Sequence, residues 1–233
     1  MAIHISNHLR AFQQLFFPHI CMGCGADYIQ PHSFLCAQCN SALPETNFFT
    51  AAQNPVEKIF YGRLLLQAAG AAFYFHKTSL LQYLLIQLKY KSNPDVGRYL
   101  GRQVGLRLKD AKRFDDVDLV IPLPLHPKKE FQRGYNQASL IGEGIAAVWS
   151  KKLITQAVIR LVNTKTQTQE NRISRWQNIE GVFFITQPHL LANQHILLID
   201  DIVTTGASLE ACGEAILKIP GVKLSIATVA YTV

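Results

Sequence analysis

The chain has 233 residues, 48% of them hydrophobic, and a formal net charge of +7. This length supports one large core plus a small extra segment, and no apolar run approaches the ~20 residues that cross a bilayer, so we expect a cytoplasmic protein without a transmembrane segment. The charge is uneven, because residues 63–113 contain ten Lys or Arg against two acids and residues 126–177 contain nine against three. A basic middle favours a polyanionic partner such as nucleic acid, although a solvated face that only keeps the protein in solution explains it equally well.

Two Cys-x-x-Cys pairs lie close together near the start of the chain. Four thiolates at this spacing form a tetrahedral structural zinc site that leaves no open position for catalysis. Two disulfides are the alternative, but no secretory signal is evident before the first cysteine. We expect a zinc-binding segment and linker at 1–55, followed by a second domain at 56–233. The four predicted zinc ligands are Cys21, Cys24, Cys36 and Cys39.

A strand at Ala69–Phe75 precedes two predicted helices, Leu80–Tyr90 and Val96–Leu108. Apolar residues at helical spacing give each helix a face for the core, which leaves its basic side chains pointing outward. Aromatic residues in the basic middle can stack on bases, although such residues more often belong to a core. The candidate stacking residues are Tyr90, Tyr99, Tyr135 and Trp176. The candidate contacts to DNA phosphates are Lys89, Lys91, Arg98, Arg102 and Lys109.

A second buried strand, Val117–Pro124, leads into a basic loop and then a helix that runs to about Trp149. Free N–H groups and the dipole at a helix start favour anions, so a basic loop between a strand and a helix predicts an anion site. The basic residues of this loop are His126, Lys128, Lys129 and Arg133.

The most informative stretch is Ile196–Ser208. Its apolar run predicts a buried parallel strand that ends in two adjacent carboxylates, Asp200 and Asp201. A turn rich in hydroxyl groups then opens a helix that ends at Leu217, an arrangement that suits a phosphate group. The carboxylates suit the hydroxyls of a ribose, directly or through a divalent cation. An ordinary strand-turn-helix with chance acids is the alternative. The turn consists of Thr204, Thr205, Gly206, Ala207 and Ser208.

Strands and helices alternate along the rest of the chain, with further strands expected at Ala157–Val162, Gly181–Ile185 and Leu224–Val229. This order predicts an α/β fold with a mainly parallel sheet and helices on both faces. Ligands of such sheets bind at the carboxyl ends of the strands, and both candidate anion loops leave from those ends.

The stretch that contains Asp200 and Asp201 resembles the signature of type I phosphoribosyltransferases, with Ser208 in place of the usual final Thr. The N-terminal cysteines, Pro122–His126, Arg133–Gln137 and a Thr-x-x-Gln motif extend the likeness, and in this order they resemble the ComF family over nearly the whole chain.

This resemblance implies a zinc finger followed by a type I phosphoribosyltransferase domain that binds phosphoribosyl pyrophosphate with Mg²⁺. It also implies single-stranded DNA as a partner and a role in DNA uptake, with other uptake proteins as possible partners. The loop with His126, Lys128, Lys129 and Arg133 would hold the pyrophosphate. A flexible loop would close over it and would include Thr166, Gln169 and Arg175.

Two functions remain open on the sequence. One is a DNA-handling protein that uses the phosphoribosyltransferase fold to bind its ligands, and the other is an active transferase with an unidentified acceptor. A third functional hypothesis is a repressor, but the sequence predicts no DNA-binding helix-turn-helix ahead of the domain.

Overall fold

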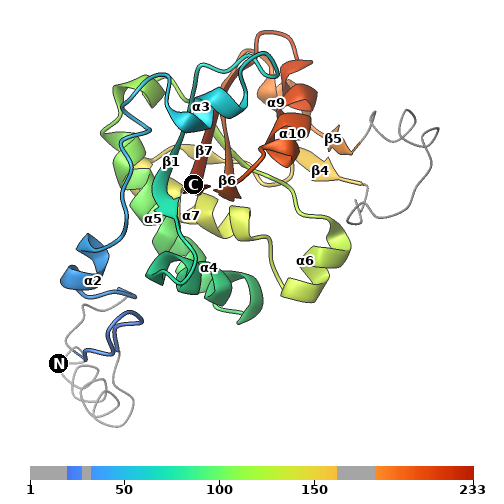
Figure 1. Ribbon diagram of the computed structural model, residues 1–233. Helices are drawn as coiled ribbons and strands as arrows, with labels where there is room; N and C mark the ends of the chain where they lie inside the picture. Colours follow the sequence, from blue (N-terminus) through green and yellow to red (C-terminus); the bar gives the residue numbers. More distant parts are fainter. Residues whose placement is uncertain (1–19, 28–32, 162–181) are drawn as a thin grey trace, which may run out of the picture. The chain divides into compact units, whose positions relative to one another are not determined.

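The computed structural model describes residues 20–27, 33–161 and 182–233 (Figure 1). The chain divides into two units, residues 1–43 and residues 44–233. In the first unit, helix α2 (Ala37–Ser41) begins at Cys36, whose Sγ accepts a hydrogen bond from the Cys39 N–H. The cap therefore brings two of the predicted metal ligands to the same helix turn.

A five-stranded parallel sheet with the strand order β1-β7-β6-β2-β3 forms the centre of the second unit. Strand β6 has parallel neighbours on both sides, so its apolar run is fully buried. This arrangement confirms the predicted α/β fold with a mainly parallel sheet. The strands are β1 (Ala68–Phe75), β2 (Leu119–Pro122), β3 (Lys152–Leu153), β6 (His195–Val203) and β7 (Lys223–Thr232).

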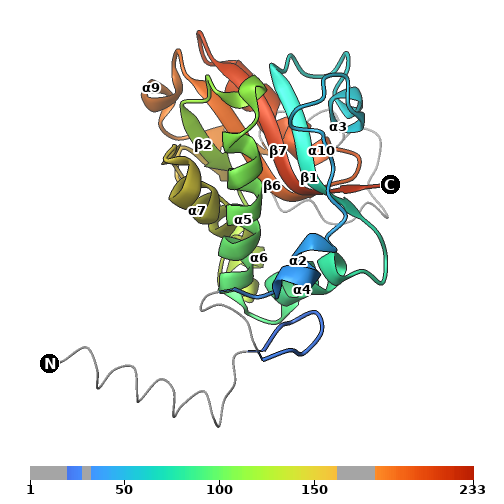
Figure 2. The same ribbon diagram turned by 90° about the vertical axis from the view of Figure 1, so that its left-hand side faces the viewer.

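Helices α5 and α7 cover one face of this sheet and α10 covers the other (Figure 2). The single helix expected after β2 is two helices, because Gly134 adopts a left-handed φ of +82° that ends α6, and Asn136 then caps α7. The helices of this unit are α3 (Pro55–Ile59), α4 (Leu80–Tyr90), α5 (Pro94–Lys109), α6 (Pro127–Arg133), α7 (Gln137–Trp149), α9 (Pro188–Leu191) and α10 (Ala207–Leu217), with a 3₁₀ turn at Lys112–Phe114.

Two further strands lie outside the parallel sheet. Strands β4 (Val158–Arg160) and β5 (Phe183–Ile185) pair with each other in antiparallel orientation. Both were predicted as strands. The order of strands and helices along the chain did not indicate that these two form a separate antiparallel pair. Their inner side joins the core that α10 also covers.

The segment before α3, which the sequence presented as a linker, covers the outer edge of β1. The Thr46 N–H donates to the Ala72 carbonyl over 2.9 Å, and the Tyr74 N–H donates to the Pro44 carbonyl over 2.8 Å. The Asn54 side chain donates to the Ala69 carbonyl over 2.8 Å. An uncovered edge strand would be open to pairing with other chains, so these bonds explain why an aperiodic segment is ordered.

Glycines allow α5 and α7 to pack at very short distance. A Cβ atom placed on Gly101 would lie 2.1 Å from the Ile141 carbonyl oxygen, and one on Gly144 would lie 2.2 Å from the Arg98 carbonyl oxygen. These contacts are with backbone atoms, which cannot rotate away. The two glycines therefore set the separation of the helices that cover one face of the sheet.

Replacing Gly101 by Ala should lower the free energy of unfolding by roughly 1–3 kcal/mol, because the added methyl group forces the two backbones apart. In an exposed helix the same change stabilises by about 1 kcal/mol, so the sign itself is diagnostic. Denaturant unfolding measures the effect, with Arg102→Ala on the exposed side of α5 as the control. A Gly101→Ala protein as stable as the parent would disprove the close packing.

Candidate functional site

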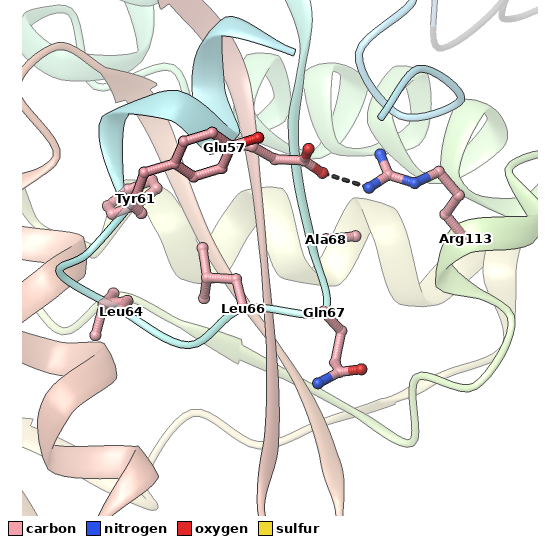
Figure 3. Close-up of a pocket in the computed structure, with 8 residues that line it drawn as sticks. Glu57, Tyr61, Leu64, Leu66, Gln67, Ala68 and Arg113 are labelled. Carbon is pink, nitrogen blue, oxygen red and sulfur yellow. Dashed lines mark hydrogen bonds and ion pairs between the residues drawn. The ribbon is translucent and has the colours of Figure 1, made fainter. Parts of the chain in front are cut away.

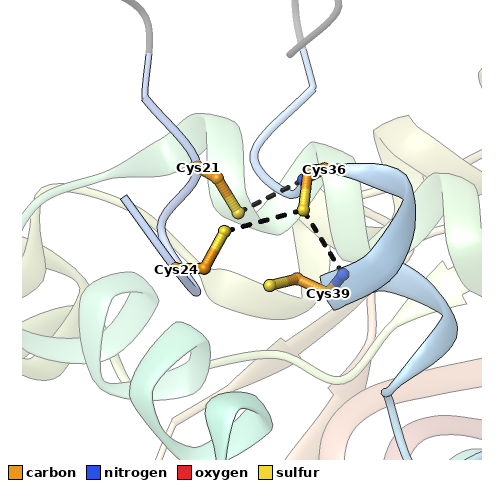
Figure 4. A group of neighbouring side chains, drawn as sticks. All are labelled: Cys21, Cys24, Cys36 and Cys39. Atoms are coloured by element: carbon orange, nitrogen blue, oxygen red, sulfur yellow. Dashed lines mark hydrogen bonds between the residues drawn. The ribbon is translucent and has the colours of Figure 1, made fainter. Parts of the chain in front are cut away.

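The four predicted zinc ligands come together in the first unit (Figure 4). Their sulfur atoms all lie within 4.8 Å of one another, and the Cys24 and Cys36 sulfurs are 3.7 Å apart. Zn–S bonds of about 2.3 Å in a tetrahedron place sulfur atoms about 3.8 Å apart, whereas a disulfide needs about 2.05 Å. The cluster can therefore hold a metal ion, and its spacing fits a sulfur-only tetrahedral site.

Backbone N–H groups support the thiolate form of Cys21. The N–H groups of Cys36 and Gly23 donate to its Sγ over 3.2 and 3.4 Å. Burial raises the pKa of Cys21, but these donors outweigh burial and lower it to about 6. These donors therefore favour the thiolate of Cys21, the form in which cysteine binds metals.

The two adjacent carboxylates near the end of β6, followed in the strand by Ile202 and Val203, have different surroundings. Successive side chains of a strand point to opposite faces of the sheet. Asp201 points to the face that α4 shares with α5 and α7, where its Oδ2 lies 2.8 Å from Lys89 Nζ. Asp200 points to the same face of the sheet as Ile196 and Leu198, whose side chains belong to the core that α10 covers. The two acids therefore have different partners, although they are adjacent in the strand.

The Lys89–Asp201 ion pair is largely shielded from water. The side chains are 22% and 9% exposed, so removing either partner leaves a desolvated charge without its counter-ion. Lys89 was a candidate contact for DNA phosphates, and the structure instead places its ammonium group against a predicted ribose ligand.

Asp200 holds its proton to unusually high pH. Burial raises its pKa from 3.8 to about 8, and the negative charge of Asp201 acts in the same direction. The positive charges of Lys89 and Arg160 lower the pKa without cancelling the rise. A protonated Asp200 can donate a hydrogen bond while Asp201 accepts one, which suits neighbouring hydroxyl groups.

The loop after β6 has the geometry expected for a phosphate site. Gly206 adopts a left-handed φ of +73° and is followed at once by α10, whose first N–H groups have no partners within the helix. A Cβ on Gly206 would lie 2.7 Å from the Phe60 ring, so no larger residue fits there. Thr204, Thr205 and Ser208 are exposed at the same turn.

Arg63 fixes this loop from the segment before β1. Its guanidinium donates to the Thr205 carbonyl over 3.3 Å and to the Ile59 carbonyl over 3.0 Å, and it forms an ion pair with Glu210 of α10. Sequence reasoning did not find Arg63, because only the fold brings a residue 142 positions away to the loop.

The second candidate anion loop lies between β2 and α7. His126 caps α6 by accepting a hydrogen bond from the Lys128 N–H over 3.1 Å, while Lys128 and Lys129 are exposed. Arg133 donates to Gln137 Oε1 over 2.8 Å, and Gln137 Nε2 is buried without a partner among the described residues. The α7 start therefore offers a free buried donor beside a cation, which sequence reasoning did not single out.

The predicted DNA contacts divide into paired and exposed groups. Arg98 forms ion pairs with Asp95 and Glu143 over 2.9 and 2.7 Å. The exposed members are Lys91, Arg102 and Lys109.

The candidate stacking residues also differ from one another. Tyr99 is buried and Tyr90 is 69% exposed. Tyr135 is half-buried, and its hydroxyl donates to the Leu88 carbonyl over 2.7 Å. Trp176 lies outside the described part of the chain. The predicted flexible-loop residues Thr166, Gln169 and Arg175 lie outside it as well.

A small cavity of about 120 Å³ lies beside the start of β1 (Figure 3). Its charged groups, Glu57 and Arg113, already form an ion pair, and Glu57 also accepts from the Ala69 N–H over 3.2 Å. Phe60 lines this cavity and also contacts Gly206. The polar groups of the cavity thus bond to one another and to the backbone of β1.

Several proteins similar to this chain are named for competence or for DNA utilization. The chain is 28% identical to competence protein F of Haemophilus influenzae over 148 aligned residues, which are 62% of this chain and 65% of that protein. It is 26% identical to the DNA utilization protein YhgH of Escherichia coli O6:H1, over 79% of this chain and 78% of YhgH. It is 31% identical over 109 residues to competence protein ComFC of Bacillus subtilis, over 46% of this chain and 42% of ComFC. The chain is a homologue of these competence and DNA utilization proteins.

Other comparisons add less. No protein-family model matches the sequence. Adenine phosphoribosyltransferase of Saccharomyces cerevisiae superposes with a TM-score of 0.40 at 18% identity, over 60% of this chain and 70% of that one. Glutamine phosphoribosylpyrophosphate amidotransferase of Bacillus subtilis also gives 0.40, at 15% identity, over 60% of this chain and 30% of that one. Within the described residues, no helix has the length and apolar character needed to span a membrane.

Replacing Cys24 by Ser should release one equivalent of bound zinc and unfold the first unit, because three sulfur ligands hold the ion poorly and the metal supplies the folding energy of so short a segment. Elemental analysis gives the metal content, and Cys212→Ala, which removes a thiol outside the cluster, should keep the full equivalent. Parent protein that contains no zinc after purification without chelators would contradict this assignment.

Replacing Asp200 by Asn should stabilise the protein increasingly as the pH rises from 5 to 8. Folded Asp200 keeps its proton up to about pH 8, whereas the unfolded carboxyl loses it near 3.8. The folded state therefore binds more protons in this window, and stability falls with pH by up to about 1.4 kcal/mol per pH unit. Asn has no proton to lose. Thermal melts of both proteins across this range test it, and a constant difference in melting temperature would show that Asp200 titrates normally.

Proposed function

We propose that this protein acts in DNA uptake, as a ComF-like protein that binds single-stranded DNA and phosphoribosyl pyrophosphate. The observation that carries the proposal is the end of β6, where two carboxylates lead through a left-handed glycine into the start of α10. The names of its homologues, competence protein F and DNA utilization protein, support the biological role. A cytoplasmic location and contacts with other uptake proteins belong to the same proposal.

Phosphoribosyl pyrophosphate fits the two loops as follows. The turn of Thr204–Ser208 binds the 5′-phosphate through its hydroxyls and the free N–H groups of α10. Asp200 and Asp201 bind the ribose hydroxyls, the latter in competition with Lys89. Lys128, Lys129 and Arg133 bind the pyrophosphate with Mg²⁺, and the buried Gln137 Nε2 supplies a further donor there.

The cysteine cluster has a structural role in this proposal. Its four sulfurs are suited to zinc, and a closed tetrahedral shell leaves no position for substrate. Zinc therefore folds the first unit and takes no part in chemistry.

Transferase activity is the second candidate, favoured by the presence of both carboxylates at the end of β6. In such a reaction an acceptor bonds to the anomeric carbon of the ribose as the bond to pyrophosphate breaks. Positioning and neutralisation of the leaving group account for most of the catalysis, and the basic loop before α7 supplies that charge. Release of pyrophosphate in the presence of an acceptor would establish it.

Asp200→Asn should reduce binding of phosphoribosyl pyrophosphate with Mg²⁺ at least tenfold at pH 8, close to the pKa of Asp200, because Asn cannot supply a carboxylate charge to the ligand and loss of a hydrogen bond to a charged group has an effect of this size. Isothermal titration at pH 8 measures it, under conditions where the variant is expected to be the more stable protein. Glu214→Gln, an exposed acid on α10, is the control. Equal affinity of all three proteins would place the ligand elsewhere.

Binding of single-stranded DNA should weaken steeply with salt, because each neutralised phosphate releases a counter-ion with a slope of about 0.7. Replacing Lys91, Arg102 and Lys109 together by Gln should flatten the slope. Arg98→Gln should change it less, since two acids already neutralise Arg98. Salt-independent binding would reduce the basic middle to a solvated face.

A further inference from the structure

The ends of α4 and α6 present two aromatic side chains to solvent. Phe131 is 91% exposed, more than any other large hydrophobic side chain in the described part of the chain, and Tyr90 is 69% exposed. A buried aromatic side chain stabilises a protein by about 2 kcal/mol relative to an exposed one. The exposure of these two rings therefore does not contribute to the stability of the fold. They call for an explanation outside the core.

Two contacts fix these helix ends beside each other. The Arg133 guanidinium lies 5.7 Å from the centre of the Tyr90 ring, within the range of a cation–π contact. The Tyr135 hydroxyl donates to the Leu88 carbonyl of α4 over 2.7 Å. The segment that carries Phe131 is thus tied to the helix turn that carries Tyr90.

Positive charge surrounds both rings. Lys91 follows Tyr90, and Lys128 lies three positions before Phe131, on the neighbouring side of the same helix turn. Lys91, Lys128 and Lys129 are exposed and form no ion pair with any described residue. Glu130 is the one acid among the residues of α6. We call these exposed residues of the two joined helix ends the aromatic–basic surface. Tyr90, Lys91 and Arg133 lie at the contact between the helices, and Lys128, Lys129 and Phe131 lie on other sides of α6.

The basic face of α5 has a different character. Arg98 is paired with two acids, and Tyr99, the aromatic residue of that helix, is 8% exposed. That face can contact phosphates but has no ring for a base.

We infer that the aromatic–basic surface binds single-stranded DNA by stacking bases on Tyr90 and Phe131 while its lysines contact the phosphates. Rings interleaved with cations suit a single strand, because unpaired bases expose their faces and a duplex does not. The inference rests on the proposed binding of single-stranded DNA and adds where the bases lie. The same turn of α4 carries Lys89, which forms the ion pair with Asp201 of the proposed phosphoribosyl site.

The test separates stacking from charge by using two strands of equal length, oligothymidylate and an abasic strand with the same phosphates. Fluorescence anisotropy gives the affinity of the full-length parent and of Tyr90→Ala and Phe131→Ala for each strand. Each variant should lose about tenfold in affinity for oligothymidylate and keep its affinity for the abasic strand. Tyr90→Phe should restore binding, because it keeps the ring.

Phe184→Ala is the matched control, since Phe184 is 55% exposed on β5, outside this surface. It should bind both strands as the parent does. Melting temperatures within a degree or two of the parent establish that the variants are folded.

Two results would overturn the inference in distinguishable ways. If the parent binds oligothymidylate and both alanine variants bind it equally well, or lose affinity for both strands alike, bases do not stack here and only the location is wrong. If the parent binds neither strand at low salt, the proposed binding of single-stranded DNA fails as well.

Discussion

The parallel pairing of β6 on both sides is the constraint on which the rest of the structure depends. Two parallel neighbours bury the apolar run of this strand, and they bring the carboxyl ends of β2 and β6 to one edge of the sheet. The loop that starts α7 and the loop that starts α10 therefore lie at the same edge, each with a helix start that favours anions. Two positive sites at one edge suit a ligand with phosphate at both ends.

The same strand places its two acids in different environments. Alternation sends Asp200 toward the core beneath α10 and Asp201 toward Lys89 of α4. One carboxyl is therefore neutralised by a proton and the other by an ammonium group, although they are adjacent in sequence.

The last turn of α4 connects the proposed ligands. Its inner side pairs with Asp201 and its outer side carries an exposed ring and an exposed lysine. A ligand that draws Asp201 away from Lys89 changes the charge at the base of the surface where a strand is proposed to lie.

The sequence by itself determined the parallel α/β fold, the cysteine cluster and the presence of a helix after the hydroxyl-rich turn, because each depends on local spacing or on a buried apolar run. The structure begins that helix at Ala207, inside the predicted turn. Only the tertiary structure decided that Arg63 holds the turn at Thr205, that Lys89 faces a carboxylate rather than solvent, and that segment 44–55 covers the edge of β1. It also decided that Tyr99 is buried while Phe131 is exposed. Periodicity shows which residues share a face of an element, but which neighbour covers that face depends on contacts between residues far apart in the chain.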